Sequence, residues 1–577
     1  MIKGEKRTTE AETEEHNEKS TKKLKTDDKK LSKSDDNAKK FKKSKKELKI
    51  KRKKANTLYD DIADAKKIFE VLRKKKLKGG KDERIELVNK LHALFVGKGH
   101  YCKVILAHDV ARIVQFLFKF GDESVRKDVA DELIPVTTSM LQSKYGRNCL
   151  KSMLKYGNSG IRFASIQKMY GNAVKFSSHL ISAAIFEYAY STWASPQQKQ
   201  DFVQEFFGDI YKQAKDKDVK HLRDVYKNSP NMKTAALQAT KANLLKVLNK
   251  NLLDSGLVQT VLCQYLSECT SEDKKELISQ LCPHAVVISN SKDGAKVVMQ
   301  CIWEGSNKDR KVIMKSIKEH VIELSKHEHG HNTIITLLDA VDDTVLLHKV
   351  ILTQILSNIQ TLIGDEYGRK VILWLVAPAD VSYFHPLFIK ELEDGREASS
   401  SKKPVIQRRE ELLEYSAFTL TNEVISNTSF WLSNGSIAMI SLAIIKSAPA
   451  DSVEDVQKAV AKVVLDIDWT VDNSNTKVLG VEHPGLHMIL KKLIQHDKEL
   501  VSNSTFSSAL LNEISSETIK KWLKLNRGCF LFVAIYETDR EELQNLLKEK
   551  LSSHMKKVKS KHSFGAKILL EKITSCD

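Results

Sequence analysis

Hydrophobic residues recur at three- and four-residue spacing from Leu58 onward, with polar residues between them. This spacing puts the hydrophobic side chains on one face of an α-helix, so it predicts a series of amphipathic helices, which come in short pairs. Proline is scarce, at 9 residues in 577, and helix-favouring Leu, Lys, Ile, Ala and Glu are plentiful. The pattern predicts an all-α protein.

Many of the predicted helices open with one pattern: a polar residue, two further residues, a glycine, two variable residues and then paired apolar positions. Clear copies cover Ser143–Leu150, Ser291–Val298, His327–Ile334, Asp365–Ile372 and His562–Leu569. Weaker copies begin at His108, with Ala111 in place of the glycine, and at His179, with Ser182 in that place. Further copies centre on Gly435, Gly485 and Gly528, and two degenerate ones are expected near Leu222 and Val258.

The interval between copies identifies the architecture. Gly294, Gly330 and Gly368 are about 36 to 38 residues apart, which is a period typical of helical solenoids. The glycine is expected to let the backbone turn tightly and begin a helix close to its neighbour. Because one helix pair is too small to be stable alone, stacked pairs must share a continuous core. We predict an α-solenoid of about 11 repeats.

Composition divides the chain into four segments. Residues 1–56 are mainly Lys, Glu, Asp, Ser and Thr, and we expect them to form a disordered basic tail. Residues 57–390 hold the N-terminal and central repeats, and residues 405–577 hold a C-terminal block with longer intervals. Residues 391–404 lack helical apolar spacing and are predicted to be a polar linker between the blocks.

The tail contains two basic clusters separated by a short spacer, a pattern typical of nuclear import signals. The predicted import residues are Lys39, Lys40, Lys42, Lys43, Lys45, Lys46, Lys51, Arg52, Lys53 and Lys54. The alternative is a tail that only improves solubility.

Charge and cysteine usage narrow the class of partner. The formal net charge is +20 and the isoelectric point is near 9.2, so the protein should attract polyanions such as nucleic acids. No apolar run is long enough to span a bilayer, and no membrane association is expected. The eight cysteines are scattered without a CxxC pair, which suits a reducing intracellular compartment.

The repeated pattern resembles the pumilio-homology (PUF) repeat, whose usual form is Asp-x-Tyr-Gly-Asn-x-Val-x-Gln. Asp365–Ile372 and Lys144–Asn148 match it best. The segment Ala107–Gln115, which follows a basic tail, is similar to the first repeat of the nucleolar Puf-A subfamily, as is the long C-terminal extension. The resemblance implies binding of structured RNA or DNA with little sequence preference, a nuclear and nucleolar location, and a place in large ribosomal subunit assembly.

In sequence-reading PUF proteins, two or three side chains of each repeat contact one base. These base-contacting positions are the first, second and fifth residues after the helix-entry glycine or its replacement. Here many of them hold Lys or Arg, which bring charge to phosphates, or apolar residues, which cannot discriminate between bases. In the third repeat only Glu187 resembles a base-reading residue. The predicted nucleic-acid-binding residues are Arg112, Arg147, Asn148, Lys151, Lys296, His331, Asn332, Arg369 and Lys370. Arg112 is accompanied by Ile113 and Phe116, which indicates that this end of the array is partly covered.

The segment His327–His331 matches the HExxH pattern of zinc proteases. That chemistry requires both histidines on one continuous helix, but Gly330 is at the expected helix start. We therefore predict a helix entry, no metal, and a His331 side chain free to stack on a base or touch a phosphate. No nucleotide-binding or hydrolase motif is present, so no enzyme and no cofactor are expected.

The sequence thus predicts a monomeric RNA-binding assembly factor that contacts structured, pre-ribosomal RNA and neighbouring pre-ribosomal proteins. Two alternatives remain open. One is a protein-interaction scaffold of HEAT or armadillo type with an acidic partner, and the other is a sequence-specific PUF regulator of messenger RNA.

Overall fold

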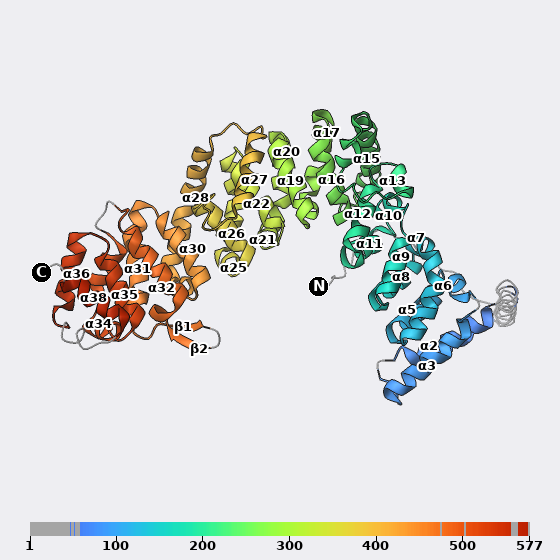
Figure 1. Cartoon of the computed structure of the whole chain (residues 1–577), viewed down its shortest axis with the longest axis horizontal. Helices are drawn as coiled ribbons and strands as arrows, with labels where there is room; N and C mark the ends of the chain where they lie inside the picture. The colour runs from blue at the N-terminus through green and yellow to red at the C-terminus, as the bar shows by residue number, and fades with distance from the viewer. Residues whose placement is uncertain are drawn as a thin grey trace, which may run out of the picture. The chain divides into compact units, whose positions relative to one another are not determined.

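A computed structural model describes residues 58–74, 76–97, 99–473, 476–500, 504–554 and 563–574, together with Glu47 and Lys51 (Figure 1). The chain divides into two compact units, Met1–Leu133 and Ile134–Asp577. Almost all regular structure in these ranges is helical, which confirms the predicted all-α class. No helix in the described ranges is long and apolar enough to cross a membrane.

The first unit packs its helices around a small core. The helices are α2 (Tyr59–Leu72), α3 (Gly80–Phe95), α4 (His100–Val104), α5 (His108–Phe120) and α6 (Glu123–Leu133). Helix α2 packs against α3 and α5. The rings of Phe69 and Phe116 meet edge to face with centroids 4.9 Å apart, and Ile113 is fully buried. The prediction that this end of the array is partly covered is confirmed.

The second unit is a succession of helix pairs. Its N-terminal part contains α7 (Thr137–Gln142), α8 (Gly146–Tyr156), α9 (Ser159–Gln167), α10 (Ala173–Ser177), α11 (Ala183–Tyr188), α12 (Pro196–Gln204), α13 (Ile210–Gln213), α14 (Asp224–Lys227), α15 (Lys233–Leu248), α16 (Gly256–Glu268), α17 (Ser271–Leu281) and α18 (Ala285–Ile288). Its central part contains α19 (Lys292–Glu304), α20 (Asn307–Ile317), α21 (Val321–Ser325), α22 (Gly330–Ala340), α23 (Thr344–Leu347), α24 (Thr353–Leu356), α25 (Ile359–Ile363), α26 (Glu366–Val376) and α27 (Pro386–Glu397). Its C-terminal part contains α28 (Val405–Ser426), α29 (Thr428–Trp431), α30 (Gly435–Lys446), α31 (Val453–Leu465), α32 (Pro484–His496), α33 (Phe506–Glu513), α34 (Ser516–Trp522), α35 (Asn526–Tyr536), α36 (Glu541–Ser552) and α38 (Phe564–Thr574).

Helices that begin at the predicted entry positions, or within two residues of them, form a row in which each packs on the next. Helix α16 packs on α19, α19 on α22, and α22 on α26 (Figure 1). The row continues from α26 to α30, and then through α32 and α35 to α38. The repeats predicted from the glycine pattern are therefore the stacking units of the solenoid.

Steric space explains why the pattern needs glycine. A Cβ atom on Gly294 would lie 1.9 Å from the carbonyl oxygen of Ile288, and one on Gly368 would lie 2.5 Å from that of Leu362. Both glycines have negative φ, so the requirement is for close approach of two backbones and not for a left-handed conformation.

In several copies the polar residue that starts the pattern caps the helix. The Gly146 N–H donates to Ser143 Oγ over 3.1 Å, and the Gly294 N–H donates to Ser291 Oγ over 3.0 Å. The Gly368 N–H donates in the same way to the Asp365 carboxylate over 2.9 Å. The side chain thus satisfies a backbone donor that the first turn of a helix leaves unpaired.

The linker prediction for residues 391–404 is wrong in its first half. Helix α27 runs through Glu397, and only the residues from Ala398 to Pro404 connect it to α28. The apolar residues of the helix are Phe388, Ile389 and Leu392, which lie before or near the start of the proposed linker. The residues that follow are mostly acidic, so the sequence there shows no apolar spacing that would predict a helix. The division into compact units also falls at Leu133 and not at this segment.

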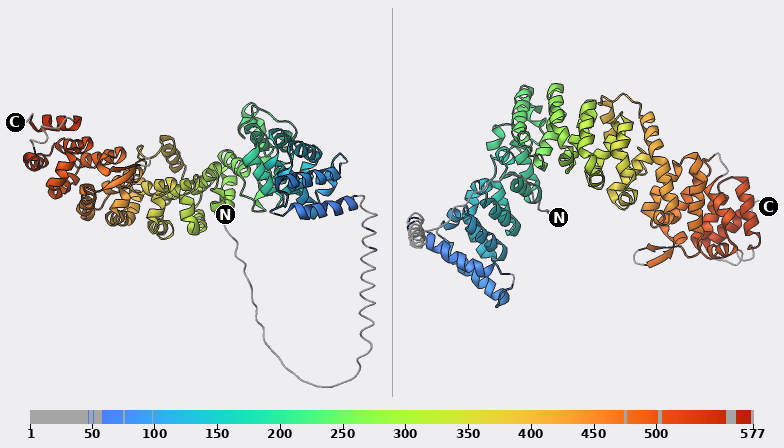
Figure 2. Two further views of the ribbon diagram at one scale, coloured as in Figure 1. Left: turned by 90° about the horizontal axis from the view of Figure 1, so that it is seen from below. Right: turned by 180° about the vertical axis from the view of Figure 1, so that it is seen from behind.

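Two further segments depart from the predicted repeat pattern. Near Leu222 the chain forms only the short helix α14, because Lys215–Lys220 offers alternating charges without apolar spacing. Between α31 and α32 a hairpin of β1 (Thr470–Asn473) and β2 (Thr476–Leu479) pairs Val471 with Val478, and Figure 2 shows it projecting from the helices. This hairpin accounts for part of the longer interval between Gly435 and Gly485.

The tail and most of its import residues lie outside the described residues. Of the ten predicted import residues, only Lys51 is described, and it is helical and exposed.

The close approach at Gly368 can be tested against a nearby glycine that has room. We expect Gly368→Ala to destabilise the protein by about 1–3 kcal/mol because the methyl group forces two backbones apart. Gly364→Ala, whose Cβ would lie 3.4 Å from its nearest neighbour, should change stability by less than about 1 kcal/mol. Urea unfolding followed by circular dichroism measures both, and equal effects of the two substitutions would refute the steric explanation.

Candidate nucleic-acid interface

In the repeats of α8 and α26, the first base-contacting position is an arginine whose guanidinium donates to a backbone carbonyl. Arg147 donates from a guanidinium nitrogen to the carbonyl oxygen of Ile181 over 2.9 Å, which links two successive repeats. Arg369 donates from Nε to the carbonyl oxygen of Ile363 over 2.7 Å. Both side chains are half-buried, so part of each guanidinium holds the solenoid together.

Helix α8 presents an exposed polar stripe. Asn148, Lys151 and Lys155 are exposed and follow one another at helical spacing, so they share one face. The Lys151 ammonium lies 5.3 Å from the ring centroid of Tyr188 on α11, which places an aromatic ring beside the charge. Two of the predicted binding residues, Asn148 and Lys151, are thus together and accessible.

The segment Ser143–Trp193 is almost free of acidic residues. Its seven basic residues are Lys144, Arg147, Lys151, Lys155, Arg162, Lys168 and Lys175, and none forms an ion pair with a described carboxylate. The single acid is Glu187, which accepts a 2.7 Å hydrogen bond from Ser255 Oγ. Burial raises the pKa of Glu187, while Ser255 and the amides of Gly256 and Leu257 oppose that shift. Glu187 therefore caps α16 and does not act as a free base reader, and the other charged residues of the segment are all basic.

The central repeats present fewer accessible groups. Lys296 forms a 2.9 Å ion pair with Glu391 of α27, and Asn332 and Lys370 are half-buried. The Lys370 ammonium lies 5.3 Å from the ring centroid of Tyr367. In the first unit, Arg112 is exposed on α5.

The prediction that His331 is free for a base or phosphate is wrong. The side chain is 5% exposed, its Nδ1 lies 3.1 Å from the carbonyl oxygen of His327, and its ring stacks on Tyr367 at 5.1 Å. Burial lowers the pKa of His331 to about 4. The helix entry is confirmed, because α22 starts at Gly330, whose N–H donates to His327 Nδ1 over 3.1 Å. His327 and Glu328 precede the helix, so the two histidines do not form the helical pair that an HExxH zinc site requires.

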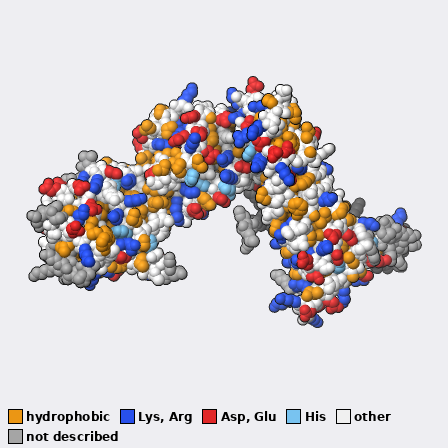
Figure 3. Space-filling model, viewed as in Figure 1, with side chains coloured by type: hydrophobic (Ala, Val, Ile, Leu, Met, Phe, Trp, Pro, Cys, Tyr) orange, Lys and Arg blue, Asp and Glu red, His pale blue; other side chains and the backbone are white. Residues whose placement is uncertain are grey.

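Net charge alone does not locate an interface. Figure 3 shows basic and acidic side chains intermixed over the face that it draws. The local absence of acids in Ser143–Trp193 is the more specific signal.

Comparison with known proteins places the chain in a family. It is 31% identical to the Drosophila melanogaster protein penguin, over 86% of this chain and 79% of the relative. It is 30% identical to pumilio homolog 3 of Rattus norvegicus, over 93% of this chain and 83% of that protein. The chain belongs to the Puf-A family of pumilio-repeat proteins.

Solved structures agree with the Puf-A assignment. The chain resembles human Puf-A in complex with DNA with a TM-score of 0.80 and 28% identity, over 89% of this chain and all of that one. Human Puf-A without DNA gives the same TM-score at 29% identity. Residues 364–506 match the CPL (NUC119) domain, which runs from α26 across the former linker to the start of α33.

The residue-by-residue prediction did not include all basic residues of the segment Ser143–Trp193. Lys155 and Arg162 lie outside the three base-contacting positions, and Arg162 stacks its guanidinium 3.8 Å from the centroid of Trp193. A count of acidic residues along the sequence would have revealed this region.

The buried histidine gives a pH prediction for this Puf-A family member. His331 stays neutral in the folded state down to about pH 4, whereas the unfolded chain binds a proton near pH 6.5. Acidification between these values therefore favours unfolding, by up to about 3 kcal/mol. We expect His331→Gln to reduce the loss of stability between pH 7 and pH 4.5, measured by urea midpoints. An unchanged dependence of the urea midpoint on pH in His331→Gln would contradict the assignment.

Proposed function

We propose that this Puf-A family protein binds RNA, and DNA in the same way, mainly through the sugar–phosphate backbone. The observation that carries the proposal is the run of seven basic residues in Ser143–Trp193 without an exposed carboxylate partner. Lysines and arginines in such a surface displace the counterions of a nucleic acid, which supplies affinity without regard to sequence. The solved complex of human Puf-A with DNA supports a nucleic-acid ligand.

The contact surface is centred on α8. Asn148, Lys151 and Lys155 offer hydrogen-bond donors toward phosphates, and Tyr188 beside Lys151 offers a ring on which an unpaired base can stack. Arg147 contributes positive potential while its guanidinium holds the next repeat. In the first unit, taken by itself, Arg112 is a separate exposed basic residue that we propose contacts nucleic acid.

Low sequence preference follows from the residues at the fifth base-contacting position. Met299, Ile335 and Leu373 occupy it in three consecutive repeats, and all three are buried. Apolar side chains that are out of contact with solvent cannot form the paired hydrogen bonds that distinguish bases.

The wider role that we propose is assembly of the large ribosomal subunit in the nucleolus. The supporting observations are membership of the Puf-A family, the basic clusters at Lys39–Lys46 and Lys51–Lys54, and a surface suited to folded RNA. The protein would act as a monomer beside pre-ribosomal proteins, with the tail providing nuclear import.

Two lysine substitutions test the surface. Lys151→Gln with Lys155→Gln should weaken binding of a hairpin RNA about tenfold, and should lower the slope of log affinity against log salt by about 1 for each lost phosphate contact. Lys462→Gln with Lys520→Gln removes the same charge from exposed lysines of α31 and α34 and should leave affinity within about twofold. Fluorescence anisotropy across a salt series measures both pairs.

The same assay separates the alternatives. Scrambled RNAs of equal structure should bind within a few-fold of one another, whereas strong discrimination among single strands would favour a messenger-RNA regulator. Loss of all RNA affinity on removal of residues 1–57 would favour a protein-interaction scaffold.

The assembly role predicts a particle association. On sucrose gradients of nuclear extract, the wild-type protein should sediment with large-subunit precursors, and the Lys151→Gln, Lys155→Gln variant should shift to the free fraction as salt is raised. Sedimentation only as free protein at low salt would contradict the role and leave RNA binding untouched.

A further inference from the structure

Helix α27 lies on the base-contacting side of the central repeats. Glu391 of α27 forms an ion pair with Lys296, which holds the second base-contacting position of α19. The helix packs against both α19 and α22. A segment that follows the α26 repeat in sequence therefore returns to cover two earlier repeats.

Close apolar packing seats this helix. The backbone of Gly395 packs directly against the indole ring of Trp303, because a Cβ atom on Gly395 would lie 2.2 Å from a ring carbon. Ile389 and Leu392 are buried on the same side of α27. Just before and within the helix, Phe384 and Phe388 pack edge to face on Trp374 of α26, at 5.0 Å and 6.4 Å.

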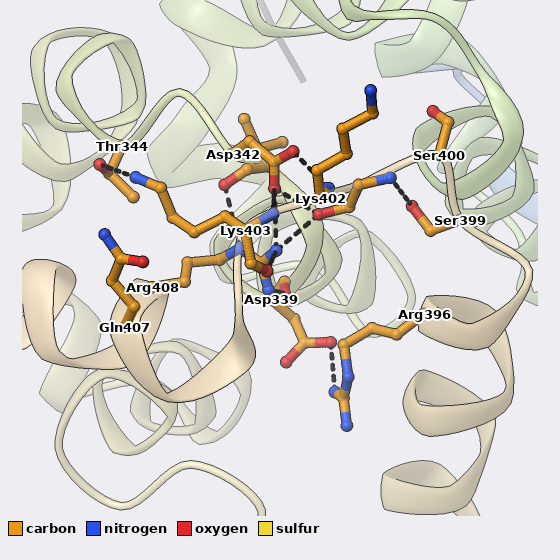
Figure 4. A network of polar contacts seen from close by, with 12 residues as sticks. Asp339, Asp342, Thr344, Arg396, Ser399, Ser400, Lys402, Lys403, Gln407 and Arg408 are labelled. Atoms are coloured by element: carbon orange, nitrogen blue, oxygen red, sulfur yellow. Dashed lines mark hydrogen bonds and ion pairs between the residues drawn. The ribbon is translucent and has the colours of Figure 1, made fainter.

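Buried ionic contacts fix the C-terminal end of α27. Arg396 donates to the Asp339 carboxylate of α22 over 2.6 Å, and Asp339 is 3% exposed (Figure 4). Burial raises the pKa of Asp339, while the neighbouring guanidinium of Arg396 opposes that shift. Beyond the helix, Arg310 donates to the hydroxyls of Ser399 and Ser400, each over 3.0 Å.

The result is that the base-contacting face of α22 is largely covered: His331 and Ile335 are buried, and Asn332 is half-buried. Every residue of α22 from Thr333 to Ala340 is buried, because α19 and α26 flank it and α27 covers it. A nucleic-acid strand cannot occupy this face while α27 is seated.

The outer surface of α27 is also unfavourable to a phosphate backbone. Glu393, Asp394 and Glu397 are exposed on it. Their charges repel phosphates, in contrast to the exposed lysines Lys151 and Lys155 of α8.

We infer that α27 occupies the place of a nucleic-acid strand on the repeats of α19, α22 and α26, and so confines binding to the remaining surface. This inference rests on the proposed function, since it states where nucleic acid does not bind. Helix α27 is then the element that prevents the central repeats from reading bases.

Lysine footprinting on the full-length protein tests the location directly. Acetylation with and without a hairpin RNA, followed by mass spectrometry, should show RNA protecting Lys151 and Lys155 at least about fivefold more than Lys296 and Lys370. Equal protection of Lys296 and Lys370 would overturn the inference while leaving nucleic-acid binding established.

A double variant that detaches α27 from the central repeats provides the second test. Glu391→Ala with Leu392→Asp breaks the ion pair and buries a charge under α27, without changing net charge. We expect RNA affinity to rise at least about fivefold as Lys296 and the central face become accessible. The matched control, Glu393→Ala with Leu387→Asp, alters the exposed side of the same helix with the same zero net charge, since Leu387 is 71% exposed, and should bind as wild type.

The outcomes separate the two proposals. No gain in affinity by an unseated variant whose circular dichroism remains helical would overturn the inference. If that variant misfolds, the footprint on the wild-type protein decides alone. If the wild-type protein binds no RNA, the proposed function fails; the inference survives only if the unseated variant then binds.

Discussion

The solenoid depends on a close approach, found at several entry helices, between the first turn of the helix and the backbone that precedes it. At Gly294 and Gly368 this approach leaves no room for a Cβ atom, and a polar side chain three residues earlier caps the same turn. The contact sets how tightly one repeat follows another. Helices α19 and α26, which carry these two glycines, both stack on α22.

Equivalent base-contacting positions differ in exposure from one repeat to another. On α8, the positions after the glycine carry exposed Asn148 and Lys151 in a segment with no free acid. On α19 and α22, Lys296 is paired with Glu391 of α27, His331 is buried against Tyr367, and Asn332 is half-buried. The repeat framework therefore specifies where side chains lie, while neighbouring elements decide whether they meet solvent.

The repeats were predictable from sequence because their signal is local. The polar cap, the glycine and the apolar pair lie within eight residues, and α8, α22 and α26 begin where that pattern places them. The site was predictable only in part. His331 is buried by Tyr367, Lys296 is paired by Glu391, and Glu187 is held by Ser255, all through contacts between residues more than 35 positions apart. Helix α27 was not predicted because its few apolar residues pack against α19 and α26, and local spacing in the sequence does not show such long-range contacts.

The return of α27 onto earlier repeats changes the cooperativity of the array. An ideal solenoid has only nearest-neighbour interfaces, so its ends can fray one repeat at a time. Here Arg396 ties α27 to α22, and Arg408 of α28 donates to the carbonyl oxygen of Asp339 over 2.6 Å. Unfolding that starts from the C-terminus must therefore disrupt α22, α27 and α28 together when it reaches α28. This segment divides a linear array into a fraying end and a core that opens as a single unit.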